Sequence, residues 1–330
     1  DLDRAVQLDP LFTDAYINRG QILLLDNRLA AALQDLQQAV DINETKDQVG
    51  RFRLESARAH YLQGAVYQGL VQPERAARSL ELSLSLDRNS DWVGQALNIL
   101  QEVNKEFPAQ VSLDHFDELI RRDPDDVIGY LGRGWAYLRL GQLEPAISDF
   151  WRIKHLGFHA AEVYAALGNA ENDLGEDLTH ARINLSHAVN IDPTNPLFHV
   201  YLGSHHSDQS HYNDRSEFDD ALKELDQAIS LDPQFALAFS SRGQVYSRMG
   251  QYQRALQDLD QAIELDPQLA DAYNNRGRVY LLTGQLDLAV QDLDRAVQLD
   301  PLFTDAYINR GQILLLDNRL AAALQDLQQA

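Results

Sequence analysis

Apolar residues recur every three or four positions along this chain of 330 residues. This spacing places them on one face of an α-helix, whereas a strand would need strict alternation of apolar and polar positions. Breaks such as Leu140, Gly141 and Gln142 divide the periodic stretches into pairs of helices of about a dozen residues. The pattern therefore predicts an all-α chain made of helix hairpins.

The hairpins repeat with a period of 34 residues. Pro233, Pro267 and Pro301 follow this spacing, and each stands after an Asp at the end of a second helix. A column of glycines marks the middle of the first helices, where Gly costs about 1 kcal/mol relative to Ala. That cost indicates a second helix that approaches too closely to leave room for a side chain. The column consists of Gly20, Gly64, Gly134, Gly168, Gly203, Gly243, Gly277 and Gly311.

An aromatic residue stands four positions before most column glycines, for example Tyr273 before Gly277. Together with the alanines of the second helices and the terminal Asp-Pro, this pattern resembles the tetratricopeptide repeat over essentially the whole chain. The resemblance implies an α-solenoid, a right-handed superhelix of about nine helix hairpins whose first helices line a concave surface. We therefore expect a single array over residues 1–330, with the aromatic column packed in its core.

The period is interrupted in three places. Gly20 and Gly64 are 44 residues apart, ten more than the period, and we expect the added residues to lengthen the following first helix. Gly203 and Gly243 are 40 residues apart. The unit at residues 91–126 has Leu100 in place of the column Gly, so we interpret it as a degenerate repeat.

Residues 1–39 and 292–330 are identical, although neighbouring units differ at half or more of their positions. The offset of 291 residues equals eight periods of 34 plus 19 added residues: ten and six at the two long gaps, two near Ser90 and one near Leu178. We therefore expect a 291-residue super-repeat of eight units, cut in mid-repeat at both ends, that belongs to a longer array or filament. A recent tandem duplication and an engineered sequence are the alternatives.

The chain is acidic, with 28 Lys and Arg against 50 Asp and Glu and a net charge of −22. Such a charge repels phosphate backbones and anionic lipids, and no apolar run is long enough to span a bilayer. We therefore expect neither a nucleic-acid partner nor membrane insertion. The absence of Cys excludes disulfides and thiolate ligands but leaves the compartment open, with the cytoplasm as the default and an extracellular filament as the alternative.

The sequence contains no phosphate-binding loop, zinc-protease motif or nucleophile elbow, so we expect no enzymatic activity, no cofactor and no metal site. The nearest approach to a set of metal ligands lies in the second insertion. Because His199 stands in the aromatic column and His206 lies on the same helix face, we expect both to pack or to form hydrogen bonds in the core. The full set is His199, His205, His206, Asp208, His211, Asn213 and Asp214.

Polar residues repeat on the side of the first helices that should line the concave groove. They are Asn18, Ser241, Asn275 and Asn309 two positions before a column Gly, Gln21, Gln244, Arg278 and Gln312 one position after it, and the adjacent Asn274. Amide side chains can hydrogen-bond the backbone of an extended peptide, and the row resembles the asparagine ladder in the repeats of O-GlcNAc transferase. The resemblance is partial, because other units carry Leu62, Gly132, Ala166 and Tyr201 at the Asn position.

We therefore predict a non-catalytic scaffold for protein–protein interactions that binds a protein or an extended peptide in this groove. The alternative is a structural subunit of a self-assembling filament, in which copies associate through continuing repeats. The identical ends of the chain favour this second hypothesis.

Overall fold

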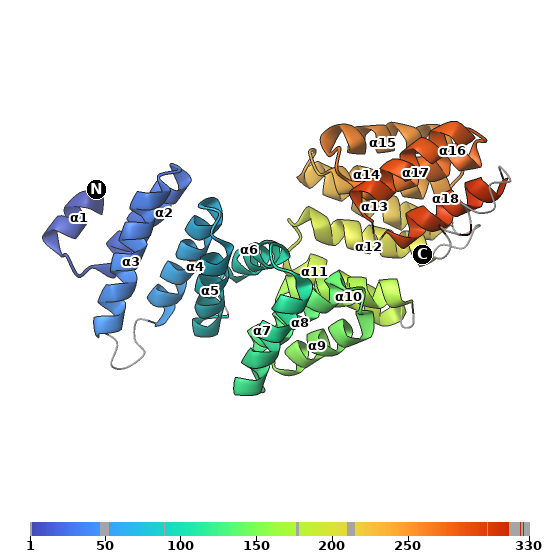
Figure 1. The fold of residues 1–330 in the computed structure, drawn as a ribbon. Helices are drawn as coiled ribbons and strands as arrows, with labels where there is room; N and C mark the ends of the chain where they lie inside the picture. The colour runs from blue at the N-terminus through green and yellow to red at the C-terminus, as the bar shows by residue number, and fades with distance from the viewer. Residues whose placement is uncertain are drawn as a thin grey trace. The chain divides into compact units, whose positions relative to one another are not determined.

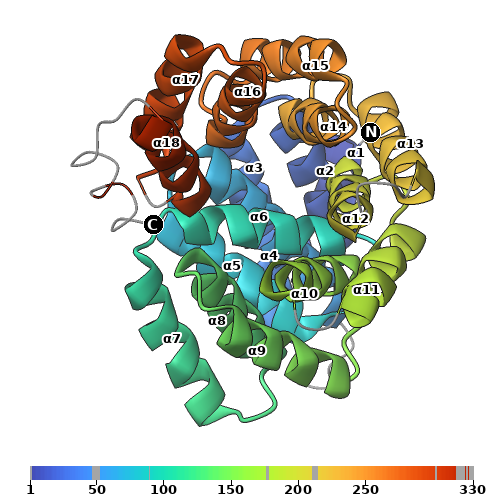
Figure 2. The ribbon, with the colours of Figure 1, turned by 90° about the vertical axis from the view of Figure 1, so that its right-hand side faces the viewer.

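The computed structural model describes residues 2–46, 53–88, 90–175, 178–209, 215–301, 303–316, 324 and 326. All regular elements in these residues are α-helices, and none of these helices has both the length and the apolar composition needed to cross a membrane. The predicted all-α solenoid of helix hairpins is confirmed (Figure 1, Figure 2). The helices form two compact units, residues 1–178 and residues 179–330, and a single array over both stays a prediction.

Unit 1, residues 1–178, alternates second helices with odd numbers and first helices with even numbers. Each first helix packs against its neighbours in the chain over most of the unit. The helices are α1 (Leu2–Leu8), α2 (Thr13–Leu25), α3 (Leu29–Lys46), α4 (Arg53–Gly69), α5 (Pro73–Leu86), α6 (Val93–Lys105), α7 (Ala109–Arg122), α8 (Val127–Arg139), α9 (Leu143–His155) and α10 (Ala161–Leu174).

Unit 2, residues 179–330, continues the same alternation. The first helices α12, α14, α16 and α18 also pack against one another in this order. The helices are α11 (Leu178–Ile191), α12 (Pro196–Gln209), α13 (Arg215–Leu231), α14 (Ala236–Arg248), α15 (Tyr252–Leu265), α16 (Ala270–Leu282), α17 (Leu286–Leu299) and α18 (Thr304–Leu316).

The column glycines lie where the second helix of the same hairpin comes closest. A Cβ atom on Gly243 would lie 2.7 Å from Cγ of Leu259, and one on Gly277 would lie 2.9 Å from Cγ of Leu293. Both leucines stand sixteen residues after their glycine and are fully buried. The predicted close approach is confirmed, and it explains why Gly is used despite its low helix propensity.

The second helices bury a stripe of alanine and leucine against the neighbouring first helices. Ala262 and Ala296 of the predicted small column are fully buried, as are Leu259 and Leu293. Full burial of a leucine side chain contributes about 1.5 to 3 kcal/mol. The leucines lie against the first helix of their own hairpin, and the next hairpin covers apolar side chains that this contact leaves exposed.

Where a second helix ends in Asp-Pro, the aspartate forms a turn with a hydrogen bond that recurs in several units. Oδ1 of Asp266, for example, accepts a hydrogen bond from the backbone N–H of Gln268 at 2.8 Å. The following aromatic residue reaches back to the same turn, because the Tyr273 hydroxyl donates to the carbonyl oxygen of Pro267 at 3.4 Å. The column is therefore less buried than predicted: Tyr16 and Tyr164 are buried, whereas Tyr130, Phe239, Tyr273 and Tyr307 are half-buried.

The first insertion lengthens the helices on both of its sides. Helix α4 has 17 residues, compared with 13 in α2, which confirms the predicted longer first helix. Helix α3, before the insertion, has 18 residues, compared with 14 in α5. Residues 47–52 of the insertion lie outside the described residues.

Gly132→Ala in α8 should destabilise the protein, because its Cβ atom would lie 2.1 Å from Cζ of Phe116, a side chain that is buried. Overpacking costs about 1 to 3 kcal/mol, partly offset by the higher helix propensity of Ala. Gly69→Ala, at the exposed last residue of α4, is the control, because its Cβ would lie 3.2 Å from Cδ1 of Leu29, a half-buried side chain that can move by a few tenths of an ångström. Urea unfolding should show a lower midpoint for Gly132→Ala only, and equal midpoints would contradict the close approach.

Candidate functional site

The polar residues predicted to line the groove lie on first helices of both units. Asn18 and Gln21 belong to α2 in unit 1, Ser241 and Gln244 to α14, Asn274, Asn275 and Arg278 to α16, and Asn309 and Gln312 to α18. Helices α14, α16 and α18 are packed neighbours in unit 2, so seven of the nine residues lie on adjacent helices. We call these seven residues the first-helix face of unit 2.

Two amides of this face connect neighbouring first helices. Nδ2 of Asn275 donates a hydrogen bond to the hydroxyl of Ser240 at 3.2 Å, and Nδ2 of Asn309 donates to Oδ1 of Asn274 at 2.9 Å. The donors are one 34-residue period apart, and so are the acceptors. Because an amide carries two N–H groups and a carbonyl oxygen, each asparagine keeps part of its hydrogen-bonding capacity for another partner.

Arg278 is the cationic residue of the first-helix face, and its side chain is half-buried. No hydrogen bond or ion pair joins it to the described residues, whereas nearby Arg248 pairs with Asp208 at 2.6 Å. Burial lowers the pKa of Arg278, and the charge of Arg248 lowers it further. An anionic partner would stabilise the charged guanidinium in this position, because a negative charge offsets both the burial and the repulsion from Arg248.

The two predicted residues of unit 1 have different surroundings. Asn18 and Gln21 of α2 are half-buried, and Oε1 of Gln21 accepts a hydrogen bond from the Arg58 guanidinium of α4 at 2.7 Å. At this point an amide and a guanidinium of successive first helices take the place of the contact between two amides. The polar row of unit 1 is thus chemically distinct from that of unit 2.

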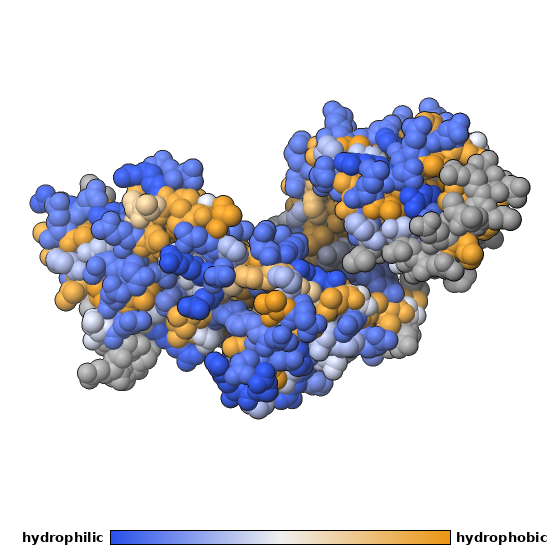
Figure 3. Space-filling view, in the orientation of Figure 1, coloured by the Kyte–Doolittle hydropathy of each residue, from blue (hydrophilic) through white to orange (hydrophobic). Residues whose placement is uncertain are grey.

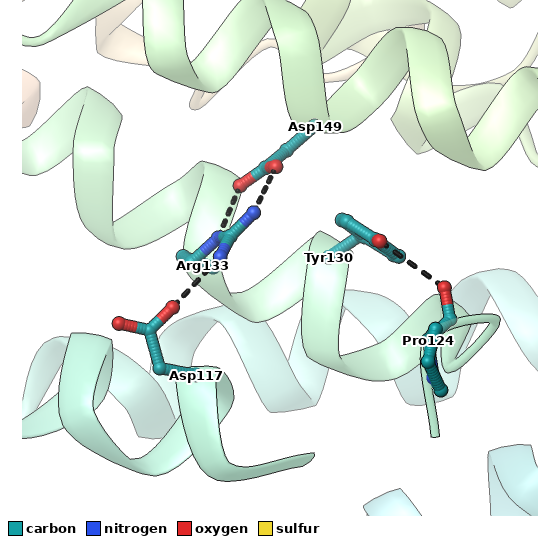
Figure 4. A network of polar contacts seen from close by, with 5 residues as sticks. All are labelled: Asp117, Pro124, Tyr130, Arg133 and Asp149. Atoms are coloured by element: carbon teal, nitrogen blue, oxygen red, sulfur yellow. Dashed lines mark hydrogen bonds and ion pairs between the residues drawn. The ribbon is translucent and has the colours of Figure 1, made fainter. Parts of the chain in front are cut away.

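A repeated arginine network joins consecutive second helices through the first helix between them, and it is absent from the sequence-based predictions. Nε and Nη2 of Arg133 donate to both carboxylate oxygens of Asp149, at 2.9 and 2.7 Å, while Nη1 donates to Asp117 at 2.7 Å (Figure 4). These hydrogen bonds, above all those to Asp149, raise the pKa of Arg133. The same arrangement occurs at Arg19, Arg242, Arg276 and Arg310.

The signal for this network is visible in the sequence. Each arginine directly precedes a column Gly, and its two aspartates lie sixteen residues before and after it. The identical segments make the same contacts, because Arg19 pairs with Asp3 and Asp35 as Arg310 pairs with Asp294 and Asp326. After the first insertion the arginine position is Gln63, and its Nε2 donates to Oε1 of Gln37 at 3.2 Å.

The histidines of the second insertion are divided among separate contacts. His199 replaces the aromatic-column residue: its Nε2 lies 3.0 Å from the carbonyl oxygen of Pro193, and its Nδ1 lies 2.7 Å from Oε2 of Glu224. Nδ1 of His206 lies 2.9 Å from Oε2 of Glu217, and His205 is buried. The predicted packing or hydrogen bonding of His199 and His206 is confirmed, while His211, Asn213 and Asp214 lie outside the described residues.

The degenerate repeat contains a cavity that the sequence does not predict. It has a volume of about 230 Å³ and lies between α5 and α7. Asn104 and Phe107 complete its wall. Nδ2 of Asn104 is buried without a hydrogen-bond partner among the described residues. At the rim, Nε2 of His115 lies 3.1 Å from Oε1 of Glu81, and this hydrogen bond raises the pKa of His115.

The repeat geometry agrees with a known protein family. A family described as tetratricopeptide repeat matches residues 1–47, 109–153, 241–302 and 289–330, more than half of the chain. The chain belongs to the tetratricopeptide repeat family. A second family, described as TPR repeat, matches residues 211–250. Tetratricopeptide repeat arrays generally act as scaffolds for protein interactions.

Several solved tetratricopeptide repeat structures resemble this one. The APC/C hetero-tetramer Cut9–Hcn1 gives a TM-score of 0.55 at 13% identity, over 99% of this chain and 88% of that chain. A tetratricopeptide repeat protein from Parabacteroides merdae gives 0.53 at 16% identity, over 82% and 99%. A thermophilic protein from Thermus thermophilus gives 0.53 at 23% identity, over 57% and 99%. These similarities concern the fold, and the comparison with curated proteins finds no match.

The pair of His199 and Glu224 should make the stability of unit 2 depend on pH. The hydrogen bond with Glu224 raises the pKa of His199, and His199 lowers the pKa of Glu224. A raised histidine pKa stabilises the fold below about 6.5, its unfolded value, and this contribution is lost as the pH rises through the folded value. A lowered glutamate pKa stabilises the fold above about 4.5, and this contribution is lost as the pH falls through the folded value.

The pair should therefore lower the free energy of unfolding between pH of about 6 and about 9, and Glu224→Gln should remove this contribution. The raised pKa of His115 adds to the fall, while the lowered pKa values of His60 and His205 oppose it. Urea unfolding at the two pH values measures it. Glu264→Gln, an exposed change of the same chemistry in α15, is the control and should keep the pH dependence of the unchanged chain. If the free energy of unfolding depends on pH equally in Glu224→Gln and in the unchanged chain, the pH dependence comes from other groups.

Arg276→Lys should weaken the contact between α15, α16 and α17. Lysine keeps the charge but cannot bind both oxygens of Asp292 while also reaching Asp260, so we expect a loss of about 1 to 3 kcal/mol in unfolding free energy. Arg254→Lys, at an exposed position of α15, should change stability by less than about 0.5 kcal/mol. Chemical denaturation of both variants tests this, and similar losses would show that the network adds little.

Proposed function

We propose that this tetratricopeptide repeat chain is a non-catalytic scaffold for protein interactions and that unit 2 binds an extended peptide along its first-helix face. The main support is the periodic row of amides, in which Asn275 and Asn309 are held by equivalent contacts from one helix to the next. Held side chains lose less conformational entropy on binding than free ones. In the view of Figure 3, hydrophilic residues cover much of the described surface of unit 2, with hydrophobic residues between them.

The spacing of the helices suits the backbone of an extended peptide. Packed helices lie about 8 to 10 Å apart, and an extended chain advances about 3.3 Å per residue. Amides on neighbouring first helices would therefore meet a peptide at about every third residue. Contacts of this kind bind backbone groups and need little information from the peptide side chains.

Charge adds one element of selectivity. Arg278 offers a half-buried guanidinium that forms no ion pair among the described residues, although Asp305 and Asp208 lie near enough to raise its pKa. A peptide can therefore place an Asp or Glu side chain opposite it. The net charge of −22 repels strongly acidic peptides at long range. We therefore expect a peptide with one acidic residue at this position and few others.

Selection from a random peptide display library on the intact chain provides peptides for the test. Asn275→Ala and Asn309→Ala should each weaken a selected peptide about fivefold, because each lost hydrogen bond costs about 1 kcal/mol. Arg278→Gln should weaken peptides that carry an acidic residue more than those that do not. Calorimetric titration measures these affinities.

Gln257→Ala and Gln291→Ala are the matched controls. They are exposed, one period apart, and lie on the second helices α15 and α17. Thermal unfolding of all variants separates lost binding from lost stability, since the asparagines also bond between helices. If the glutamine variants weaken the peptide and the asparagine variants do not, the binding face lies on the second helices. The filament hypothesis stays a prediction that no contact described here tests.

A further inference from the structure

We propose that His206, Glu217 and Asp220 form a binding site for one divalent transition-metal ion, with Zn²⁺ as the best-fitting ion. One ligand atom from each of the three side chains lies within 4.8 Å of the others. The site is separate from the first-helix face of α14, α16 and α18, and the inference holds whether or not a peptide binds there.

The two helices of one hairpin supply the ligands. His206 lies near the end of α12, while Glu217 and Asp220 lie at the start of α13. Residues three positions apart occupy the same side of an α-helix, so both carboxylates face in similar directions. The site therefore joins the two helices on either side of the second insertion.

The distances are close to those of a coordinated ion. Nδ1 of His206 and Oε2 of Glu217 are 2.9 Å apart across a hydrogen bond, and a bound ion would take the place of the proton between them. Metal bonds of about 2.0 to 2.2 Å separate adjacent ligands of one ion by about 3 to 3.5 Å. Ligand atoms as far apart as 4.8 Å can approach an ion through side-chain rotation. Glu217 is half-buried and Asp220 is exposed, so both side chains have room to rotate.

The charges around the site are not balanced by protein groups. Among the described residues, no lysine or arginine forms an ion pair with Glu217 or Asp220, and the contact of Glu217 is with His206. Neighbouring acids are paired, since Asp208 binds Arg248 and Glu224 binds His199. The two carboxylate ligands are anionic groups that a divalent cation attracts.

The ligand types select among metals. Imidazole nitrogen with carboxylate oxygen suits Zn²⁺, Ni²⁺ or Mn²⁺, whereas Mg²⁺ and Ca²⁺ prefer oxygen ligands alone. Three protein ligands leave further coordination positions for water. The sequence offered several histidines of one segment as candidate ligands. Among those that the structure describes, it brings His206 together with two carboxylates of the next helix.

The test uses the full chain, stripped with EDTA and titrated with ZnCl₂ at neutral pH by calorimetry. We expect one saturable site per chain, and a higher melting temperature with Zn²⁺ than with EDTA, because an ion that binds the folded state stabilises it. Asp220→Asn, Glu217→Gln and His206→Gln should each weaken this site at least tenfold. Loss of groups that only support a ligand already costs about 10- to 100-fold.

Asp219→Asn is the decisive control. Asp219 is exposed, stands next to Asp220 on α13 and loses the same charge, but it does not belong to the cluster. Equal melting temperatures in EDTA will show that both variants fold. Unchanged Zn²⁺ affinity in Asp219→Asn, with weak affinity in Asp220→Asn, supports the site. Equal effects of the two variants, equal binding of Mg²⁺, or no saturable binding would each overturn it.

Discussion

The close approach of two helices at a column glycine is the constraint on which the rest of this structure depends. It lets a fully buried leucine of the second helix, such as Leu259 or Leu293, lie against the backbone of the first. The hairpin still leaves apolar side chains uncovered, and only the next hairpin can cover them. The sequence is periodic because every hairpin must bury the same apolar face against its neighbour. The degenerate repeat, which carries Leu100 at the glycine position, also supplies Asn104 and Phe107 to the wall of a cavity.

The features that could be predicted from the sequence are those with a local cause. Glycine at a close contact and proline after a helix end each leave a mark at fixed spacing, so the hairpins and their boundaries were foreseeable. The positions of Asn275 and Asn309 were also foreseeable, but their bonds to Ser240 and Asn274 were not, because these depend on the distance between neighbouring repeats. The half-buried state of Tyr273 has the same origin, since its hydroxyl reaches the turn of the preceding hairpin.

Polar contacts between repeats do more than stabilise the stack. The amide contacts of unit 2 orient side chains that a peptide can use, and the arginine network beside them fixes the helices that carry these amides. The proposed site of His206, Glu217 and Asp220 differs from both, because its residues lie on the two helices of one hairpin, on either side of the second insertion. This site could not be predicted from the sequence, because the clustered histidines suggested that the other ligands would come from the same segment. The relevant carboxylates instead follow on the next helix.

The arginine network also bears on how such a chain can grow. Each arginine takes one aspartate from the hairpin before it and one from its own, so every repeat carries half of the contact that its successor needs. A recombination event that inserts a whole repeat in register therefore supplies both acceptors for the new arginine and leaves the old ones satisfied. Where the first insertion breaks the register, Gln63 stands at the arginine position and bonds to Gln37 instead of to an aspartate. Gene duplication can thus lengthen the regular stretches without compensating substitutions, while the irregular ones resist it.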